Sequence, residues 1–93
     1  MKAVVLYREN SEQYRPVHEF ITMLERRYPG RTVQRLDIDT RDGAAEASLY
    51  GVTQYPAIIV KSVDGQVIQM WEGDRLPLVD EVAVHLIHEP AMV

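Results

Sequence analysis

Hydrophobic and polar positions change their spacing several times along the chain, and each change marks a new element. Residues 2–7 (KAVVLY) form a mostly apolar run, which is typical of a strand buried on both faces. The next segment has a period of about 3.6 residues, which predicts an amphipathic helix with one apolar stripe. The stripe consists of Val17, Phe20, Ile21, Leu24 and Tyr28, and Pro29-Gly30 ends the helix.

The middle of the chain repeats this strand–helix alternation on a smaller scale. Residues 32–39 (TVQRLDID) predict a second strand, with Leu36 and Ile38 facing one side. A short alanine-rich helix follows, for which Thr40 or Asp42 is a suitable N-cap. Gly51 suits the left-handed position after the last turn of this helix.

The last third of the chain predicts a hairpin and a final helix. Residues 57–63 (AIIVKSV) and 67–71 (VIQMW) have the composition of strands, and Asp64-Gly65 between them is a strong hairpin signal. Gly73 ends the second strand, and Pro77 fits the first turn of the last helix. One face of that helix carries Val79, Val82, Ala83, Leu86 and Ile87.

The elements therefore follow one another as βαβ, α and ββα, which defines an α/β protein. Two strands joined through a helix are parallel, whereas the strands of the hairpin are antiparallel. We therefore expect a four-stranded mixed sheet with helices on both faces. We also expect a single domain over residues 1–93, with an ordered core at about residues 2–88 and a frayed tail at residues 89–93.

Composition and charge narrow the function classes. The apolar runs are far shorter than the ~20 residues that span a membrane, and no apolar stretch of secretory-signal length is present, so we expect a cytoplasmic protein that does not bind a membrane. The formal net charge is −4 and the bases form no stripe, which argues against nucleic acid as a partner. The chain has no cysteine, which excludes disulfides, thiolate nucleophiles and cysteine-ligated metal clusters.

Several segments resemble the thioredoxin family. The most specific is residues 49–60 (LYGVTQYPAIIV), which is similar to a thioredoxin run that ends in a cis-proline before an apolar strand. The matching positions are Tyr50, Gly51, Val52 and Pro56. Residues 36–39 (LDID) resemble the strand end ahead of the family's second helix, and residues 64–73 (DGQVIQMWEG) resemble its final hairpin. The resemblance covers about residues 2–88 and implies a thioredoxin-like fold.

The same resemblance places the family's Cys-x-x-Cys motif on Ser11-Glu12-Gln13-Tyr14, where both cysteines are replaced. The tryptophans that precede the motif are absent, as is the buried acidic residue, which would fall near Val5. The family's helical proline appears earlier here, as Pro16. Because disulfide exchange needs a thiolate sulfur, serine cannot replace the missing cysteine. The resemblance thus implies a scaffold that is not a thiol-disulfide oxidoreductase.

Ser11 allows a catalytic and a structural interpretation. As a nucleophile it would need a general base, and His18 lies about 10.5 Å away along a helix. As a structural residue, Asn10 or Ser11 would cap the helix, and Gln13 has the spacing of a capping box with Asn10. We adopt the capping interpretation.

Tyr14 stands where the family has its more buried cysteine, and we expect its ring to fill that space. An alternative comes from glutathione transferases, which share the scaffold and use a Tyr or Ser near the end of the first strand to stabilise the glutathione thiolate. Tyr7, Ser11 and Tyr14 lie in that region. However, the acidic-Ser turn that follows the cis-proline of those enzymes is missing after Pro56.

The resemblance also implies a cis Tyr55–Pro56 bond, beside which the family's backbone pairs with an extended peptide or with glutathione. We therefore expect a ligand groove at Ser11, Tyr14, Tyr55, Pro56 and Gly73. Arg8 and Arg15 flank the motif and could contact an anion, although we prefer to interpret them as part of a solvated face.

The last helix carries an acid–histidine cluster. Its members are Glu81, His85, His88 and Glu89. We interpret this cluster as a solvated helix end, because a metal site needs three or four converging ligands, and we expect no cofactor. The sequence therefore predicts a redox-inactive thioredoxin-like domain that binds a peptide or protein partner in the groove and is not an enzyme. The alternative is a glutathione-binding, transferase-like domain, and self-association is a further option.

Overall fold

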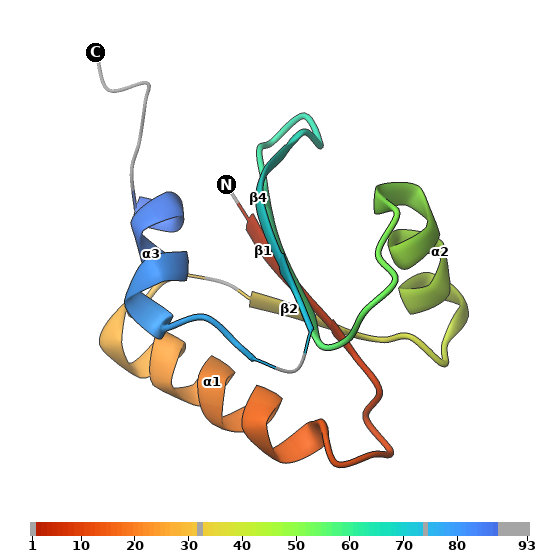
Figure 1. The fold of residues 1–93 in the computed structure, drawn as a ribbon. Helices are drawn as coiled ribbons and strands as arrows, with labels where there is room; N and C mark the ends of the chain where they lie inside the picture. Colours follow the sequence, from red (N-terminus) through yellow and green to blue (C-terminus); the bar gives the residue numbers. More distant parts are fainter. Residues whose placement is uncertain (1, 32, 74, 88–93) are drawn as a thin grey trace.

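The computed structural model describes residues 2–31, 33–73 and 75–87, and its elements follow the order expected from the sequence (Figure 1). The strands are β1 (Lys2–Tyr7), β2 (Val33–Asp37), β3 (Ala57–Lys61) and β4 (Val67–Glu72). The helices are α1 (Tyr14–Arg27), α2 (Arg41–Tyr50) and α3 (Val79–Ile87). None of these helices has both the length and the apolar character needed to cross a membrane.

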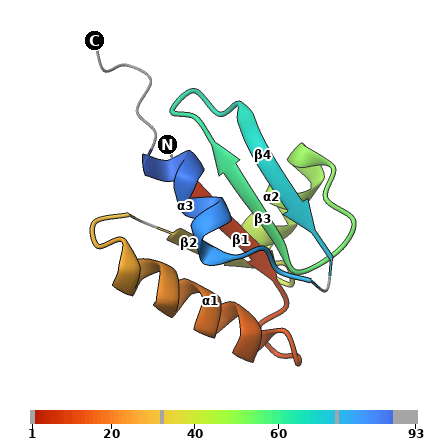
Figure 2. The same cartoon turned by 60° about the vertical axis from the view of Figure 1, so that its left-hand side comes forward.

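The strands form a four-stranded sheet in the order β2-β1-β3-β4 (Figure 2). β1 pairs in parallel with β2, where Leu6 lies opposite Leu36, and antiparallel with β3, where Leu6 lies opposite Ala57. β4 pairs antiparallel with β3 at the edge of the sheet. The expected mixed sheet, with a parallel first pair and an antiparallel last pair, is confirmed.

Helices cover both faces of this sheet. Figure 1 views the sheet nearly edge-on, with α1 and α3 on one side and α2 on the other. Side chains alternate along a strand, so Ala3, Val5 and Tyr7 face α1 and α3, whereas Val4 and Leu6 face α2. Both sets are at most 2% exposed, which explains why β1 has a continuous apolar run instead of an alternating pattern.

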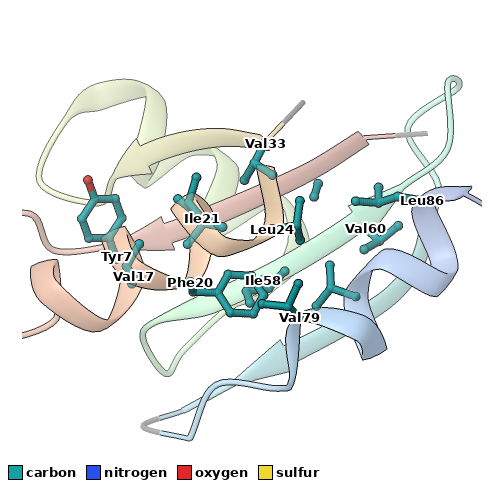
Figure 3. Close-up of a cluster of buried hydrophobic side chains, with 13 residues drawn as sticks. Tyr7, Val17, Phe20, Ile21, Leu24, Val33, Ile58, Val60, Val79 and Leu86 are labelled. Carbon is teal, nitrogen blue, oxygen red and sulfur yellow. The ribbon is translucent and has the colours of Figure 1, made fainter. Parts of the chain in front are cut away.

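The apolar stripe of α1 packs against the sheet, as its period predicts. Its buried members, Val17, Phe20, Ile21 and Leu24, belong to the cluster drawn in Figure 3. Tyr28 packs at the edge of this cluster, and its hydroxyl donates to Asp80 Oδ1 at 2.7 Å near the start of α3. The stripe therefore connects α1 both to the sheet and to α3.

β2 ends earlier than the sequence suggests, because the chain turns at Asp37. The Thr40 N–H donates to the Asp37 carbonyl at 2.9 Å, and the Asp39 N–H donates to Asp37 Oδ1 at 3.0 Å. Thr40 is the N-cap of α2, and its hydroxyl accepts the Gly43 N–H at 3.1 Å. Gly51 ends α2 in the left-handed conformation, with a φ of 67°. The expected Thr40 cap and the expected Gly51 position are both confirmed.

The hairpin lies where Asp64-Gly65 predicts it, although β3 already ends at Lys61. The Ser62 N–H donates to the Gln66 carbonyl at 2.9 Å, and the Gly65 N–H donates to the Ser62 carbonyl at 3.0 Å. Gly65 has a φ of 90°, which favours glycine. This is the geometry of a three-residue loop with glycine in its last position.

α3 begins at Val79, so Pro77 lies before the helix and not in its first turn, as the sequence had suggested. Glu81 stabilises this start instead, because its Oε1 accepts the Leu78 N–H at 2.8 Å, which is one half of a capping box. The expected apolar face is buried at Val79, Val82, Ala83 and Leu86. The expectations for the Ile87 side chain and for the tail at residues 89–93 lie outside the described part of the chain.

Candidate functional site

The loop from β1 to α1 lies beside the loop that precedes β3. The Gln13 Nε2 group of the first loop donates to the Tyr55 carbonyl of the second at 3.5 Å. A groove of about 270 Å³ lies at this junction. It is lined by Glu12, Gln13, Pro16, Pro56 and Leu76. The segment that aligns with Cys-x-x-Cys is therefore adjacent to Pro56.

Ser11 organises the turn before α1. Its hydroxyl donates to the Arg8 carbonyl at 2.6 Å and accepts the Gln13 N–H at 3.1 Å. The Tyr14 N–H donates to the Ser11 carbonyl at 3.2 Å and closes this turn. The N-cap position of α1 is Gln13, and its side chain makes no capping bond. The prediction that Asn10 or Ser11 caps α1 is wrong, because the chain makes one more turn before the helix begins.

Tyr14 and His18 form a pair on the outer surface of α1. Their rings are stacked, with 5.5 Å between centroids and an interplanar angle of 12°. Tyr14 is 42% exposed, so the expectation that its ring fills a buried space is wrong. His18 Nδ1 lies 3.3 Å from the Arg35 Nη1. His18 is therefore engaged away from Ser11, which supports the structural interpretation of that serine.

Gln13 joins the two loops through both ends of its carboxamide. Its Oε1 accepts the Arg8 N–H at 2.8 Å, and its Nε2 donates to the Tyr55 carbonyl at 3.5 Å. The sequence assigned Gln13 only to a capping box with Asn10. The side chain does reach back to a backbone N–H, as a capping box requires, but that N–H belongs to Arg8.

The loop before β3 is held by its own hydrogen bonds. The Tyr55–Pro56 peptide bond is cis, and Pro56 is buried. The Pro56 carbonyl accepts the Gly73 N–H at 3.1 Å, and the Tyr55 hydroxyl donates to the Val52 carbonyl at 3.2 Å. Gly73 has a φ of 109°, a conformation that favours glycine, where the chain leaves β4. These contacts fix the Tyr55 carbonyl and the Pro56 ring beside Gln13.

The residues expected at the groove take different positions around it. Pro56 lines the groove directly. Ser11 lies in the adjoining turn, and Tyr14 lies on the outer surface of α1. Tyr55 and Gly73 support the loop that carries Pro56.

Four lining residues were missed as groove residues at the sequence level: Glu12, Gln13, Pro16 and Leu76. Pro16 carried a usable signal, because it corresponds to the family's helical proline. Glu12 and Gln13 lie at the two variable positions of the aligned motif, where the family pattern specifies no residue type. Leu76 lies in the irregular segment between β4 and α3, where no periodic pattern predicts its position.

The two possible anion contacts, Arg8 and Arg15, differ in their surroundings. The Arg8 guanidinium contacts Asp39, with 3.2 Å from Nε to Oδ2, whereas Arg15 is exposed on α1.

The Tyr7 hydroxyl donates to Glu9 Oε1 at 3.1 Å. Burial raises the pKa of Tyr7, and the hydrogen bond to Glu9 raises this pKa further. The Tyr7 hydroxyl is therefore already engaged as a donor to Glu9, which does not favour a role with a glutathione thiolate.

The expected acid–histidine cluster is only partly within the described residues, since His88 and Glu89 lie outside them. His85 packs edge-to-face against Trp71, with 5.8 Å between ring centroids. Glu81 binds the start of α3. Across residues 2–31, 33–73 and 75–87, no three acidic, histidine or cysteine side chains are grouped to hold a metal ion.

Comparison with known proteins gives matches to solved structures. No protein-family model matches the chain, and no curated protein does. A malarial protein is similar with a TM-score of 0.69 and 13% identity, over 91% of each chain. Thioredoxin 1 from Thermosipho africanus TCF52B gives 0.67 and 13%, over 92% of this chain and 90% of that one. Thioredoxin O2 from Arabidopsis thaliana gives 0.68 and 17%, over 89% and 69%.

These identities are low, so the likeness concerns the fold and carries no activity with it. The sheet order and the helices on both faces agree with it. The absence of cysteine sets this chain apart from the redox chemistry of Cys-x-x-Cys proteins. The chain therefore has a thioredoxin-like fold and carries no cysteine.

Proposed function

We propose that this chain is a redox-inactive thioredoxin-like domain that binds an extended segment of a peptide or protein partner in the groove beside Pro56. The observation that carries the proposal is the composition of that groove. Pro16, Pro56 and Leu76 supply apolar surface, and Glu12 and Gln13 supply polar groups beside them. Apolar pockets with a few placed polar groups are typical of ligand sites.

The size and position of the groove favour a peptide over a cofactor. Its volume of about 270 Å³ is below the roughly 300–1,000 Å³ of ordinary small-molecule pockets, which suits one or two side chains. The Tyr55 carbonyl lies at the same junction. In peptide recognition, main-chain hydrogen bonds supply affinity and side-chain pockets supply specificity. The Tyr55 carbonyl can accept a main-chain hydrogen bond, and the groove can receive a side chain.

Peptide selection followed by NMR mapping tests this proposal. A display library of unstructured peptides is selected on the immobilised chain, and the enriched peptides are titrated into ¹⁵N-labelled protein. We expect the largest shifts at the amides of Glu12, Gln13, Tyr55 and Leu76. Met23, on the outer surface of α1, and Leu49, on α2, should not move. Shifts confined to surfaces such as Met23 or Leu49 would show that the binding site lies elsewhere.

A further inference from the structure

We propose that Gln13 controls access to the groove, because its carboxamide occupies the backbone acceptor that a bound segment needs. This inference rests on the proposed peptide-binding function. A bound segment would displace Gln13 Nε2 from the Tyr55 carbonyl and donate its own backbone N–H there. Gln13 would then lower the affinity of the groove for every segment that binds in this way.

The strand register shows what the Gln13 side chain replaces. β1 and β3 pair antiparallel from Lys2 opposite Lys61 to Leu6 opposite Ala57. Continuing this register by two residues places Arg8 opposite Tyr55. The Arg8 N–H and the Tyr55 carbonyl are instead connected through the Gln13 side chain. A carboxamide has the donor and the acceptor of a peptide group, so Gln13 stands where a peptide group would fit between the two strand ends.

The two hydrogen bonds of this carboxamide differ in geometry. The bond from the Arg8 N–H to Oε1 is 2.8 Å, inside the usual range for N–H···O bonds. The contact from Nε2 to the Tyr55 carbonyl is 3.5 Å, beyond that range. The Tyr55 carbonyl is therefore the end that a ligand can take over, while Oε1 stays on Arg8.

Two substitutions separate the two ends of Gln13. Gln13→Glu keeps an oxygen for the Arg8 N–H but has no donor for the Tyr55 carbonyl. Gln13→Met keeps the length of the side chain and removes both bonds. If Gln13 competes with the ligand, both variants should bind a selected, uncharged peptide about three- to tenfold more tightly than the wild type. This factor corresponds to the net free energy of one ordinary hydrogen bond.

Gln69→Met is the matched control. Gln69 is an exposed glutamine whose Oε1 likewise accepts a backbone N–H, that of Met70 at 3.0 Å, but it lies on β4 away from the groove. We expect this variant to bind the peptide as the wild type does. Peptides should be selected on the wild type and on Gln13→Met in parallel, and affinities measured by isothermal titration calorimetry.

A second readout follows the two hydrogen bonds of Gln13 directly. In ¹⁵N spectra, the Gln13 side-chain NH₂ signals should shift toward solvent values when peptide binds, while hydrogen exchange at the Arg8 N–H stays slow. Gln13→Met should exchange this N–H faster in the free protein, and Gln13→Glu should not.

The outcomes distinguish this inference from the proposed function. Tighter binding by both Gln13 variants, with Gln69→Met unchanged, supports control by Gln13, and so does binding seen only after Gln13 is replaced. Equal or weaker binding by the Gln13 variants overturns it and leaves peptide binding standing. If neither the wild type nor Gln13→Met retains any peptide, the proposed function and this inference both fail.

Discussion

At the scale of single residues, Gly43 illustrates a requirement that no local pattern shows. It lies in the first turn of α2, where the helix starts against the end of β2. A Cβ built on Gly43 would lie 2.0 Å from the Asp37 carbonyl oxygen, which is backbone and cannot rotate away. In sequence, Gly43 is an isolated glycine in an alanine-rich helix. A glycine is needed here because the chain turns at Asp37, at the end of β2. The sequence-based prediction continued this strand to Asp39 and so did not locate the turn.

Gly43→Ala should therefore destabilise the fold even though alanine is the better helix former. Overpacking of this kind costs roughly 1–3 kcal/mol, and more where backbone must move. Chemical denaturation of the variant measures this change in the free energy of unfolding. Ser48→Ala, at an exposed position of the same helix, should stay within about 0.5 kcal/mol of the wild type. A Gly43→Ala protein as stable as that control would show that α2 does not approach Asp37 so closely.

At the scale of elements, α1 and α3 are joined by one cluster of polar contacts. Asp80 Oδ1 accepts the Tyr28 hydroxyl at 2.7 Å and lies 3.1 Å from Arg27 Nη1. The hydrogen bond from Tyr28 lowers the pKa of Asp80, and Arg27 lowers it further. The pKa of Asp80 is lower in the folded state than in the unfolded state. The contact therefore stabilises the fold fully at pH values above the ordinary pKa of an aspartate, and this stabilisation is lost as the pH falls through the folded-state pKa.

Tyr28→Phe should move the pKa of Asp80 upward, toward its ordinary value, while keeping the ring packed at the edge of the core. A carboxyl ¹³C NMR titration measures this shift directly. Asp64 is an internal control, because its pKa is lowered by Ser62 in the distant hairpin and should not respond. An unchanged Asp80 titration would mean that Tyr28 and Asp80 are not bonded in solution.

Much of the element level could be predicted because it depends on local periodicity. The α1 stripe, the Thr40 and Gly51 ends of α2, and the Asp64-Gly65 hairpin all follow from side-chain spacing and turn chemistry. The helix starts were less predictable. α1 begins after an additional turn held by the Ser11 hydroxyl, and α3 begins beyond Pro77, where the Glu81 side chain accepts the Leu78 N–H.

At the scale of the whole molecule, the fold and its lack of thiol chemistry were accessible from the sequence, whereas most of the residues that line the groove were not. The Tyr50-to-Pro56 segment and the order of elements indicated a thioredoxin-like chain, and the composition excluded cysteine. The groove is formed by three separate segments, which contribute Pro16, Pro56 and Leu76. These three residues come together only through the packing of the loops at the end of the sheet, and the spacing of residues along the chain does not predict this packing.

The composition leads to a direct prediction about activity. Disulfide exchange proceeds through a thiolate and a mixed disulfide, and the chain supplies no thiol. The purified protein should therefore show no turnover in an insulin-reduction assay with dithiothreitol, above the rate without protein. A thioredoxin with its Cys-x-x-Cys motif serves as the positive control, and turnover by this chain would contradict the account.

Calorimetric titration of a selected peptide into two matched α1 variants tests the central claim most directly. Pro16→Glu adds a charge inside the groove, and Met23→Glu adds the same charge to the outer surface of the same helix. An acidic residue is favourable in the first turn of a helix, so Pro16→Glu should fold. We predict that Pro16→Glu weakens binding about tenfold or more, because an apolar wall becomes charged, while Met23→Glu binds as the wild type does. Equal affinities for the two variants, or a greater loss in Met23→Glu, would contradict a peptide site at this groove.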